Sequence, residues 1–164
     1  MDTDIPVICS WVRTRQVLQL VSGDAADFLT PALLSGWLAR AQIAIVVADE
    51  VANQPAGFCT LSCLEVPHLP ASYVEICHLI VAPEFRHLFI GSRLVRAAKS
   101  LAHDFGYRFV CCRVTPTNKW ALALARAQGF QEFTNIKDWL PHGFRWFRFA
   151  LVGSTNTNTR TEHL

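Results

Sequence analysis

The most informative segment of this chain is Glu75-Ile76-Cys77-His78-Leu79-Ile80-Val81-Ala82-Pro83-Glu84-Phe85-Arg86-His87-Leu88-Phe89-Ile90-Gly91-Ser92. Its first half is an apolar run typical of a buried strand, and Pro83 ends that strand. A short turn follows, and Gly91 and Ser92 stand among the first residues of a helical pattern. Such a junction aims backbone N–H groups and the positive end of the helix at one point. We expect an anion such as a pyrophosphate to bind there, although a plain strand–loop–helix connection explains the same residues.

Strand and helix patterns continue on both sides of this junction. Thr30-Pro31 indicates a helix start, because threonine caps free N–H groups and proline suits the first turn. We predict strands over Ile5–Val12, Ile43–Ala48, Gly57–Val66, Tyr73–Val81, Phe109–Thr115, Phe130–Asn135 and Phe144–Val152, and helices over Gln16–Val21, from Thr30-Pro31 to Ala41, over Ser92–Phe105 and over Asn118–Gln128. This order predicts a mixed α/β sheet with an antiparallel first half, a right-handed crossover in the second half, and helices on both faces.

Composition limits the classes of function. The 164 residues carry a net charge of only +2, which argues against nucleic acid as a partner. The longest uncharged stretch, Val51–Leu64, has 14 residues and is too short and too polar to span a membrane. The acidic start Met1-Asp2-Thr3-Asp4 is unlike a secretory signal, so we expect a cytoplasmic protein. We predict one domain over residues 1–152 and a disordered polar tail over 153–164.

The cysteines favour buried reduced thiols over a metal site. Cys59, Cys77, Cys111 and Cys112 lie in apolar, strand-like runs, where a free thiol behaves as a small hydrophobic side chain. None of the six cysteines forms a C-x-x-C pair, and the chain has no H-E-x-x-H segment. We therefore predict no bound metal.

The order of several short motifs resembles the GNAT superfamily of acyl-CoA-dependent N-acetyltransferases. Val81-Ala82-Pro83 followed by Arg86-His87-Leu88-Phe89-Ile90-Gly91 is similar to the pyrophosphate loop of that family. Val114, Asn118, Ala121, Leu124 and Gly129-Phe130 match its second signature, and Gly57-Phe58 looks like its third strand. Each motif is weak alone, but together and in this order they are specific over residues 43–133.

This resemblance implies a central sheet that splays between its fourth and fifth strands to admit the pantetheine arm of acetyl-CoA, a co-substrate. Backbone groups of the fourth strand would pair with that arm, and the turn after it would hold the pyrophosphate. The implied cofactor-binding residues are Leu79, Ile80, Val81, Arg86, His87, Leu88, Phe89, Ile90, Gly91, Ser92 and Asn118. Asn118 is equally well explained as a helix N-cap, and both roles can hold at once.

Two residues depart from the family pattern. Phe89 replaces a glycine that adopts positive φ, and we expect phenylalanine to donate the same N–H only at negative φ, with a shifted loop or weaker binding. Ala125 stands where many members carry a tyrosine that protonates the departing thiolate. A thiolate is a good leaving group, so loss of this acid need not abolish turnover.

Glu75 is the candidate general base, because attack on a thioester requires a neutral amine. Apolar neighbours should raise its pKa, and some family members place a catalytic glutamate at this position. The alternative is a glutamate at the exposed beginning of the strand, paired with a basic surface residue. Strand alternation predicts that Glu75, Cys77 and Leu79 share one face and that His78, a weaker candidate base, faces away. Cys77 is a still weaker candidate, as an acetyl-carrying nucleophile.

The expected activity is transfer of acetyl from acetyl-CoA to a primary amine of a small molecule or peptide. Acids and aromatics in the segments that usually wall the acceptor pocket would suit a cationic amine, namely Asp24, Asp27, Trp37, Asp138, Trp139 and His142. Solvated acids and core tryptophans explain each of them as well. A non-catalytic acyl-CoA-binding domain and an interaction module are the alternative functions. The sequence leaves the oligomeric state open, a homodimer included.

Overall fold

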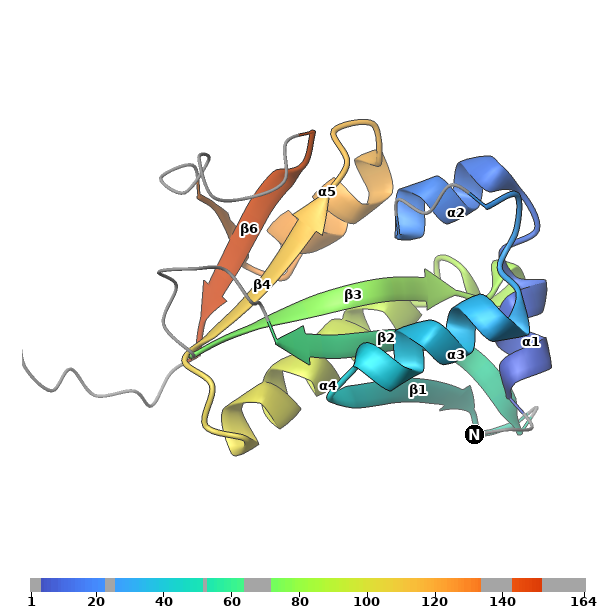
Figure 1. Ribbon diagram of the computed structural model, residues 1–164. Coiled ribbons are helices and arrows are strands. Elements are labelled where there is room, and N and C mark those ends of the chain that lie inside the picture. The colour runs from blue at the N-terminus through green and yellow to red at the C-terminus, as the bar shows by residue number, and fades with distance from the viewer. Residues whose placement is uncertain (1–3, 23–25, 52, 64–71, 134–142, 152–164) are drawn as a thin grey trace, which may run out of the picture.

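The computed structural model describes residues 4–22, 26–51, 53–63, 72–133 and 143–151 (Figure 1). Its elements are α1 (Ile5–Ser10), α2 (Arg15–Val21), α3 (Pro31–Arg40), β1 (Ile43–Asp49), β2 (Gln54–Cys63), β3 (Tyr73–Val81), the 3-10 turn η1 (Pro83–Phe85), α4 (Ile90–Asp104), β4 (Phe109–Val114), α5 (Lys119–Ala127), β5 (Gln131–Glu132) and β6 (Arg145–Ala150). The strands described form one sheet in the order β1-β2-β3-β4-β6-β5. The predicted tail lies outside the described residues.

The sheet consists of two wings that meet only at the beginning of β3. In the first wing β1, β2 and β3 pair antiparallel, which confirms the predicted antiparallel first half. In the second wing β4 and β5 pair antiparallel with β6. β3 and β4 are parallel and pair only over Tyr73–Glu75, after which they diverge (Figure 1). The separation that the family resemblance implies is therefore present, and it starts at Glu75.

Helices cover both faces of the sheet, as predicted. On one face α1 and α3 contact β2, while α2 contacts β3. On the other face α4 packs across β1 to β4, and α5 packs on β4. Each face has its own apolar core. Trp37, Phe58 and Ile80 belong to the first core, whereas Leu94 and Val110 belong to the second.

The predicted strand over Ile5–Val12 is wrong, because residues 5–10 form helix α1. Apolar side chains occupy nearly every position there, so alternation and helical spacing both fit the sequence. The buried residues Ile8, Trp11 and Val12 follow the helical spacing and join the core beside α3. Pro6 stands in the first turn, where its missing N–H costs nothing. Within the described residues the sheet consequently has one strand fewer than predicted.

Most of the other predicted elements are present with small shifts at their ends. Thr30 caps α3 as predicted, its hydroxyl accepting a hydrogen bond from the Leu33 N–H at 3.2 Å. β5 is much shorter than its predicted range of 130–135 and covers only Gln131–Glu132 within the described residues. No helix in the described part of the chain has the length and apolar character needed to cross a membrane.

Gly57 of β2 sets how closely α4 lies on the sheet. A Cβ atom at this position would stand 2.6 Å from Ile90 Cγ2 and 2.9 Å from Leu94 Cδ1. Both contacts are closer than packed side chains tolerate, so only glycine fits beneath this first turn of α4. The position of the helix start, and of its N–H groups, thus depends on one glycine in the neighbouring strand.

Candidate active site

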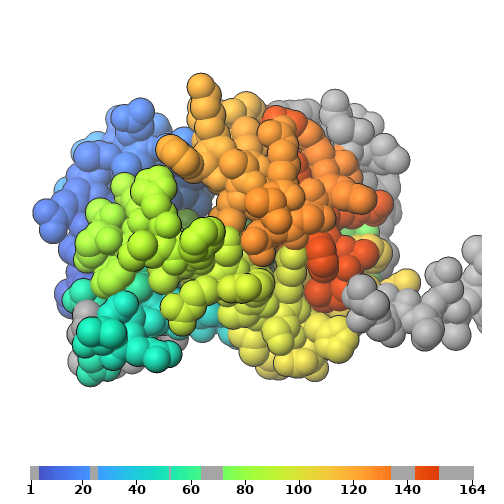
Figure 2. Space-filling view, turned by 180° about the vertical axis from the view of Figure 1, so that it is seen from behind, coloured from blue at the N-terminus to red at the C-terminus, as the bar shows by residue number. Residues whose placement is uncertain are grey.

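The gap between β3 and β4 opens into a cavity of about 740 Å³. Both strands contribute to its wall, together with α2, the turn after β3, the first turn of α4, and α5. Figure 2 shows the opening from behind, between the blue N-terminal helices, the yellow-green turn after β3 and the orange α5. All the predicted catalytic and cofactor-binding residues line this cavity except Leu88, which is exposed outside it. One concave site therefore brings together the candidate base and the candidate pyrophosphate loop.

A β-bulge at His78 changes which side chains of β3 face the cavity. Phe58 pairs with Ile80 and Thr60 pairs with Cys77, so His78 and Leu79 together oppose the single residue Cys59. His78 takes the extra position with φ 53°. Beyond it the alternation is reversed.

The predicted alternation along β3 is therefore wrong. Leu79 packs with Val74 and Ile76 in the core under α4, on the face opposite to Glu75 and Cys77. The His78 ring stacks on Trp37 of α3 instead of facing away from the site, with ring centroids 4.0 Å apart and planes at 7°. The Thr60 hydroxyl lies 2.9 Å from His78 Nδ1. His78 lines the cavity and becomes a second candidate for proton transfer.

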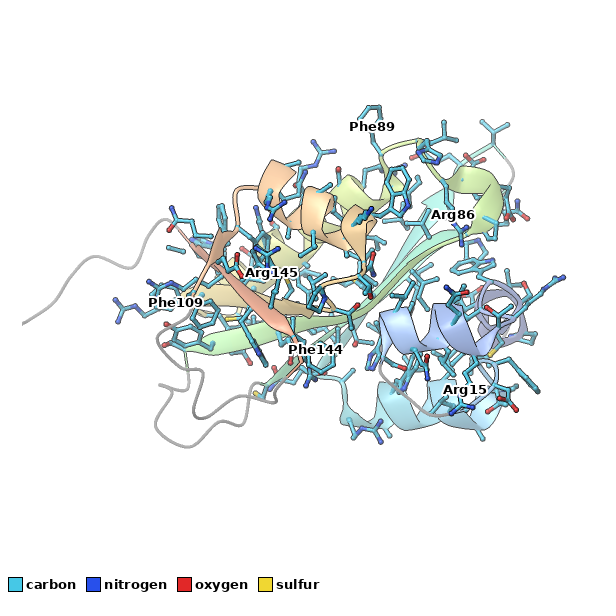
Figure 3. All side chains as sticks on the ribbon, turned by 90° about the horizontal axis from the view of Figure 1, so that it is seen from above. Arg15, Arg86, Phe89, Phe109, Phe144 and Arg145 are labelled. Atoms are coloured by element: carbon cyan, nitrogen blue, oxygen red, sulfur yellow. The ribbon has the colours of Figure 1, made fainter. Side chains whose placement is uncertain are left out.

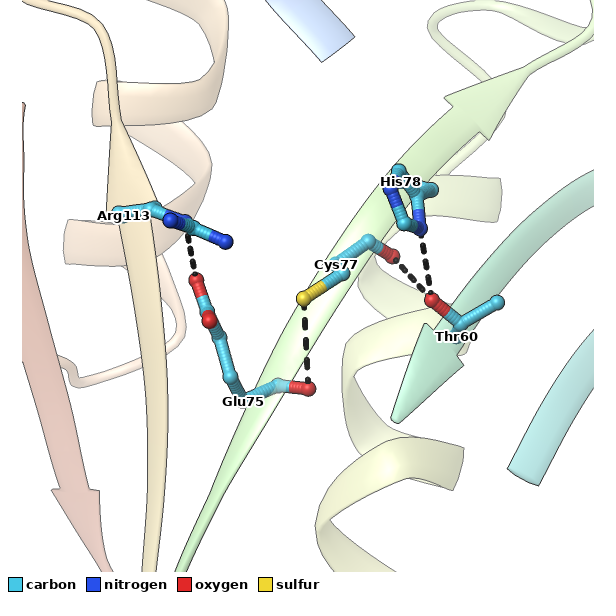
Figure 4. Close-up of polar contacts among 5 residues, drawn as sticks. All are labelled: Thr60, Glu75, Cys77, His78 and Arg113. Carbon is cyan, nitrogen blue, oxygen red and sulfur yellow. Dashed lines mark hydrogen bonds and ion pairs between the residues drawn. The ribbon is translucent and has the colours of Figure 1, made fainter. Parts of the chain in front are cut away.

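Glu75 is buried at the point where the two strands separate, only 3% exposed. Its Oε1 lies 2.8 Å from Arg113 Nε of β4, across the gap (Figure 4). Hydrogen bonds with the Arg113 and Cys77 side chains accompany this ion pair. Burial raises the pKa of Glu75, and the Arg113 guanidinium opposes that rise. The alternative of a glutamate at an exposed strand beginning is wrong, although its pairing with a basic residue is present.

The thiols beside Glu75 are protonated. Burial and the nearby Glu75 charge raise the pKa of Cys77 to about 12. The same two causes raise the pKa of Cys112 to about 12. A protonated thiol is a weak nucleophile, which argues against Cys77 as a carrier of the acetyl group.

The turn before α4 keeps a glycine-like conformation without glycine. Phe89 has φ 60° and ψ 12°, and His87 has φ 65°. The expectation that phenylalanine requires negative φ here is therefore wrong. The Phe89 side chain is 79% exposed and points away from the fold (Figure 3), so its bulk does not block the loop.

Gly91 and Asn118 both have structural roles at the cavity wall. A Cβ atom at Gly91 would lie 3.2 Å from Leu124 Cδ2, so this glycine lets α4 approach α5. Asn118 caps α5 by accepting a hydrogen bond from the Ala121 N–H at 3.1 Å, as the N-cap interpretation predicted. Its amide nitrogen donates to the Leu20 carbonyl at 3.4 Å and so links α5 to α2.

Ala125 occupies the position where many members of the family carry a tyrosine, and no other tyrosine takes that place in the cavity. The two tyrosines of the chain are Tyr73 and Tyr107, and neither lines the cavity. Tyr73 stacks on Phe109 at the closed end of the sheet. The Tyr107 hydroxyl donates to Gln42 Oε1.

The predicted acceptor residues do not form a group. Trp37 is buried in the core, where it supports His78, and Asp27 is exposed and outside the cavity wall. The other four, Asp24, Asp138, Trp139 and His142, lie outside the described residues. Sequence reasoning missed Arg113, whose charge in the middle of an otherwise apolar strand was the available signal.

Comparison with known proteins points to one family. The sequence model of the acetyltransferase (GNAT) family matches residues 12–130. An uncharacterized N-acetyltransferase of Methanocaldococcus jannaschii is 34% identical over 92 residues, which are 56% of this chain and 41% of that protein. The chain therefore spans less than half the length of this relative.

Solved structures share the fold. One is a phosphinothricin acetyltransferase from Sinorhizobium meliloti in complex with AcCoA, with a TM-score of 0.75 and 17% sequence identity. The match covers 98% of this chain and 91% of the chain of that enzyme. A ribosomal-protein-alanine N-acetyltransferase from Brucella melitensis has a TM-score of 0.71 and 16% identity, covering 92% and 96%. The diverging strands, the helix start beside them and the matched family model lead to one conclusion: the chain belongs to the GNAT acetyltransferase family.

Proposed function

We propose that this protein transfers the acetyl group of acetyl-CoA to a primary amine by direct attack. The observation that carries the proposal is the cavity between β3 and β4, with the start of α4 at one end and Glu75 at the other. The backbone of Leu79 and Val81 is free of β4, so it can pair with the pantetheine arm as an added strand would.

The start of α4 supports pyrophosphate binding. The first N–H groups of a helix have no partner within it, and the helix dipole adds positive potential at this end. Arg86 and His87 line the same part of the cavity, which supplies further donors for an anion. Lys99 does not contribute, because its ammonium donates to the Gln128 carbonyl at 2.6 Å and lies over the Phe149 ring.

Glu75 supplies the base in this proposal. It takes one proton from the acceptor ammonium, directly or through water, and frees the nitrogen lone pair to form the N–C bond. As that bond forms, the C–S bond of the thioester breaks, its electron pair leaves with sulfur, and the nitrogen releases its second proton to solvent. No tyrosine lines the cavity, so the thiolate takes its proton from solvent.

The substitution Glu75→Gln tests this assignment. We expect unchanged affinity for acetyl-CoA in calorimetry, since the side chain lies away from the pyrophosphate end. We expect kcat to fall tenfold or more, the low end for loss of a general base. The acidic limb of the pH–rate profile should also disappear. An unchanged profile would remove Glu75 as the base, and His78→Gln then tests the second candidate.

A non-catalytic acyl-CoA-binding domain is the second candidate function, favoured by the lack of a tyrosine at the cavity wall. Calorimetry with acetyl-CoA and a thiol-release assay over a panel of amines separate the two functions. Binding together with release on at least one amine supports the enzyme. Binding without release on any amine supports the alternative, and no binding at all contradicts both.

A further inference from the structure

The cavity wall is nearly free of charge apart from three residues. Among the described lining residues the only Asp, Glu, Lys or Arg side chains are Glu75, Arg86 and Arg113. Arg86 follows the end of β3, at the proposed pyrophosphate end. Glu75 and Arg113 form their ion pair about 20 Å away along β3, at roughly 3.3 Å per residue. Arg113 is therefore the basic residue of the end where the acceptor amine must react.

Arg113 has more hydrogen-bond donors than its contact with Glu75 uses. The guanidinium group carries five N–H donors, and its Nε lies 2.8 Å from Glu75 Oε1. The rings of Phe144 and Trp146 lie 5.9 and 5.7 Å from the guanidinium carbon, and rings accept no ordinary hydrogen bond. Arg113 also forms a hydrogen bond with the Cys77 side chain, and the Arg113 side chain is 39% exposed, so part of its guanidinium group remains accessible from the cavity. Figure 4 shows the guanidinium extending from β4 toward β3, into the gap.

Glu75 presents the complementary group. Its carboxylate is buried beside Arg113 and Cys77, and hydrogen bonds with both side chains oppose the rise of its pKa. An ionised carboxylate has about four lone-pair sites, so it can accept a further donor from a ligand beside these two partners. The amine of an acceptor can supply that donor at Glu75, while Arg113 remains open to an anion.

We propose that the acceptor is an amino acid or a close analogue, a primary amine with a carboxylate a few bonds away, whose carboxylate binds Arg113. The ion pair is 2.8 Å long, so the two groups that complement it must also lie close together. A polyamine would place a second positive charge beside Arg113, and a simple alkyl amine would bring no anion to the guanidinium charge. This inference rests on the proposed acetyltransferase function and names its substrate class.

Matched pairs of acceptors test it. Each pair consists of an α-amino acid and its carboxamide, which differ in the negative charge but keep the same amine and side chain. For the wild-type protein we expect kcat/KM to favour the acid by about tenfold to hundredfold, the range for one charge-assisted hydrogen bond.

The variant Arg113→Gln should bring this ratio close to one, and Arg113→Lys should keep part of it. The ratio is the appropriate readout, because loss of Arg113 also alters Glu75 and both acceptors use the same base. Arg86→Gln is the control, since it removes a cation from the other end of the cavity and should leave the ratio unchanged. If Arg113→Gln does not fold, the ratio for the wild-type protein and the ratio for Arg113→Lys still test the proposed acceptor class.

Two different results would overturn the proposal. If the wild-type protein acetylates the carboxamides as well as the acids, the acceptor class is wrong while the acetyltransferase function stands. If acetyl-CoA binds but no amine in the panel releases thiol, the proposed function fails and this inference fails with it.

Discussion

At the scale of single residues, Phe89 is the least expected feature of the site. A left-handed conformation costs an ordinary residue about 1–2 kcal/mol, and the side chain is 79% exposed, so packing repays little of that cost. The loop thus keeps its conformation against the preference of its own residue. Such strain is commonly kept where a loop serves a ligand.

Replacing Phe89 by glycine should relieve this strain. Glycine also makes the unfolded chain more flexible, which lowers the stability by about 0.5–1 kcal/mol. We therefore expect the free energy of unfolding to rise by up to about 1 kcal/mol in total. Urea denaturation measures it. Phe105→Gly is the matched control, because Phe105 is 66% exposed at the other end of α4 with φ −82°. An equal loss of stability in both variants would show that Phe89 stores no strain.

Glu75 makes stability depend on pH. Burial raises its pKa above the ordinary 4.5, so the folded protein binds this proton more tightly than the unfolded chain. This tighter proton binding adds to the free energy of unfolding. The added stability is fully present below pH 4.5 and is lost as the pH rises through the raised pKa of Glu75. We therefore expect Glu75→Gln to gain stability relative to the wild type with rising pH.

Denaturation of both proteins from pH 4.5 to 9 measures this difference in the free energy of unfolding. Glu84→Gln removes an exposed carboxylate and is the control, for which we expect no such trend. A difference that stays constant, or that shrinks with rising pH, would contradict the burial argument.

At the scale of elements, the sequence predicted helices and strands correctly where the apolar pattern fitted only one of the two. The predicted bounds of β3, Tyr73–Val81, coincide with the structure because proline and a continuous apolar run define them. The segment at residues 5–10 failed because it is apolar at nearly every position. The bulge at His78 could not be predicted, since no glycine marks it and it depends on the register with β2.

The contact between β2 and α4 gives the prediction at this scale. Gly57→Ala forces a methyl group against Ile90 and Leu94 and should cost about 1–3 kcal/mol of stability. Because α4 must shift, affinity for acetyl-CoA should fall as well. Gly36→Ala is the control, since its nearest neighbour in α3 is the end of Arg40 at 3.8 Å, and we expect about 0.5–1 kcal/mol of stabilisation. A neutral Gly57→Ala would show that α4 has room to move.

At the scale of the whole molecule, the site is a property of the sheet. Glu75 and Arg113 are far apart in sequence and meet because β3 and β4 are parallel neighbours at the point where they separate. Local patterns could identify Glu75, since its strand and the turn after it are continuous in sequence. They could not identify its partner, because that pairing depends on a crossover through α4.

The charge distribution has the same origin. A net charge of +2 says little about binding, but among the residues that the structure describes the fold leaves one acid and two arginines on the wall of the cavity. One arginine lies at each end, with the acid beside the one on β4. The charge pattern of the site therefore comes from the topology of the sheet and not from the overall composition.

A crystal structure of the protein with acetyl-CoA would show whether the cofactor lies between β3 and β4. We expect the pantetheine arm between β3 and β4, paired with the backbone of Leu79 and Val81, the pyrophosphate at the start of α4, and the thioester near Glu75. Acetyl-CoA bound on another surface, with the space between β3 and β4 unfilled, would contradict this expectation.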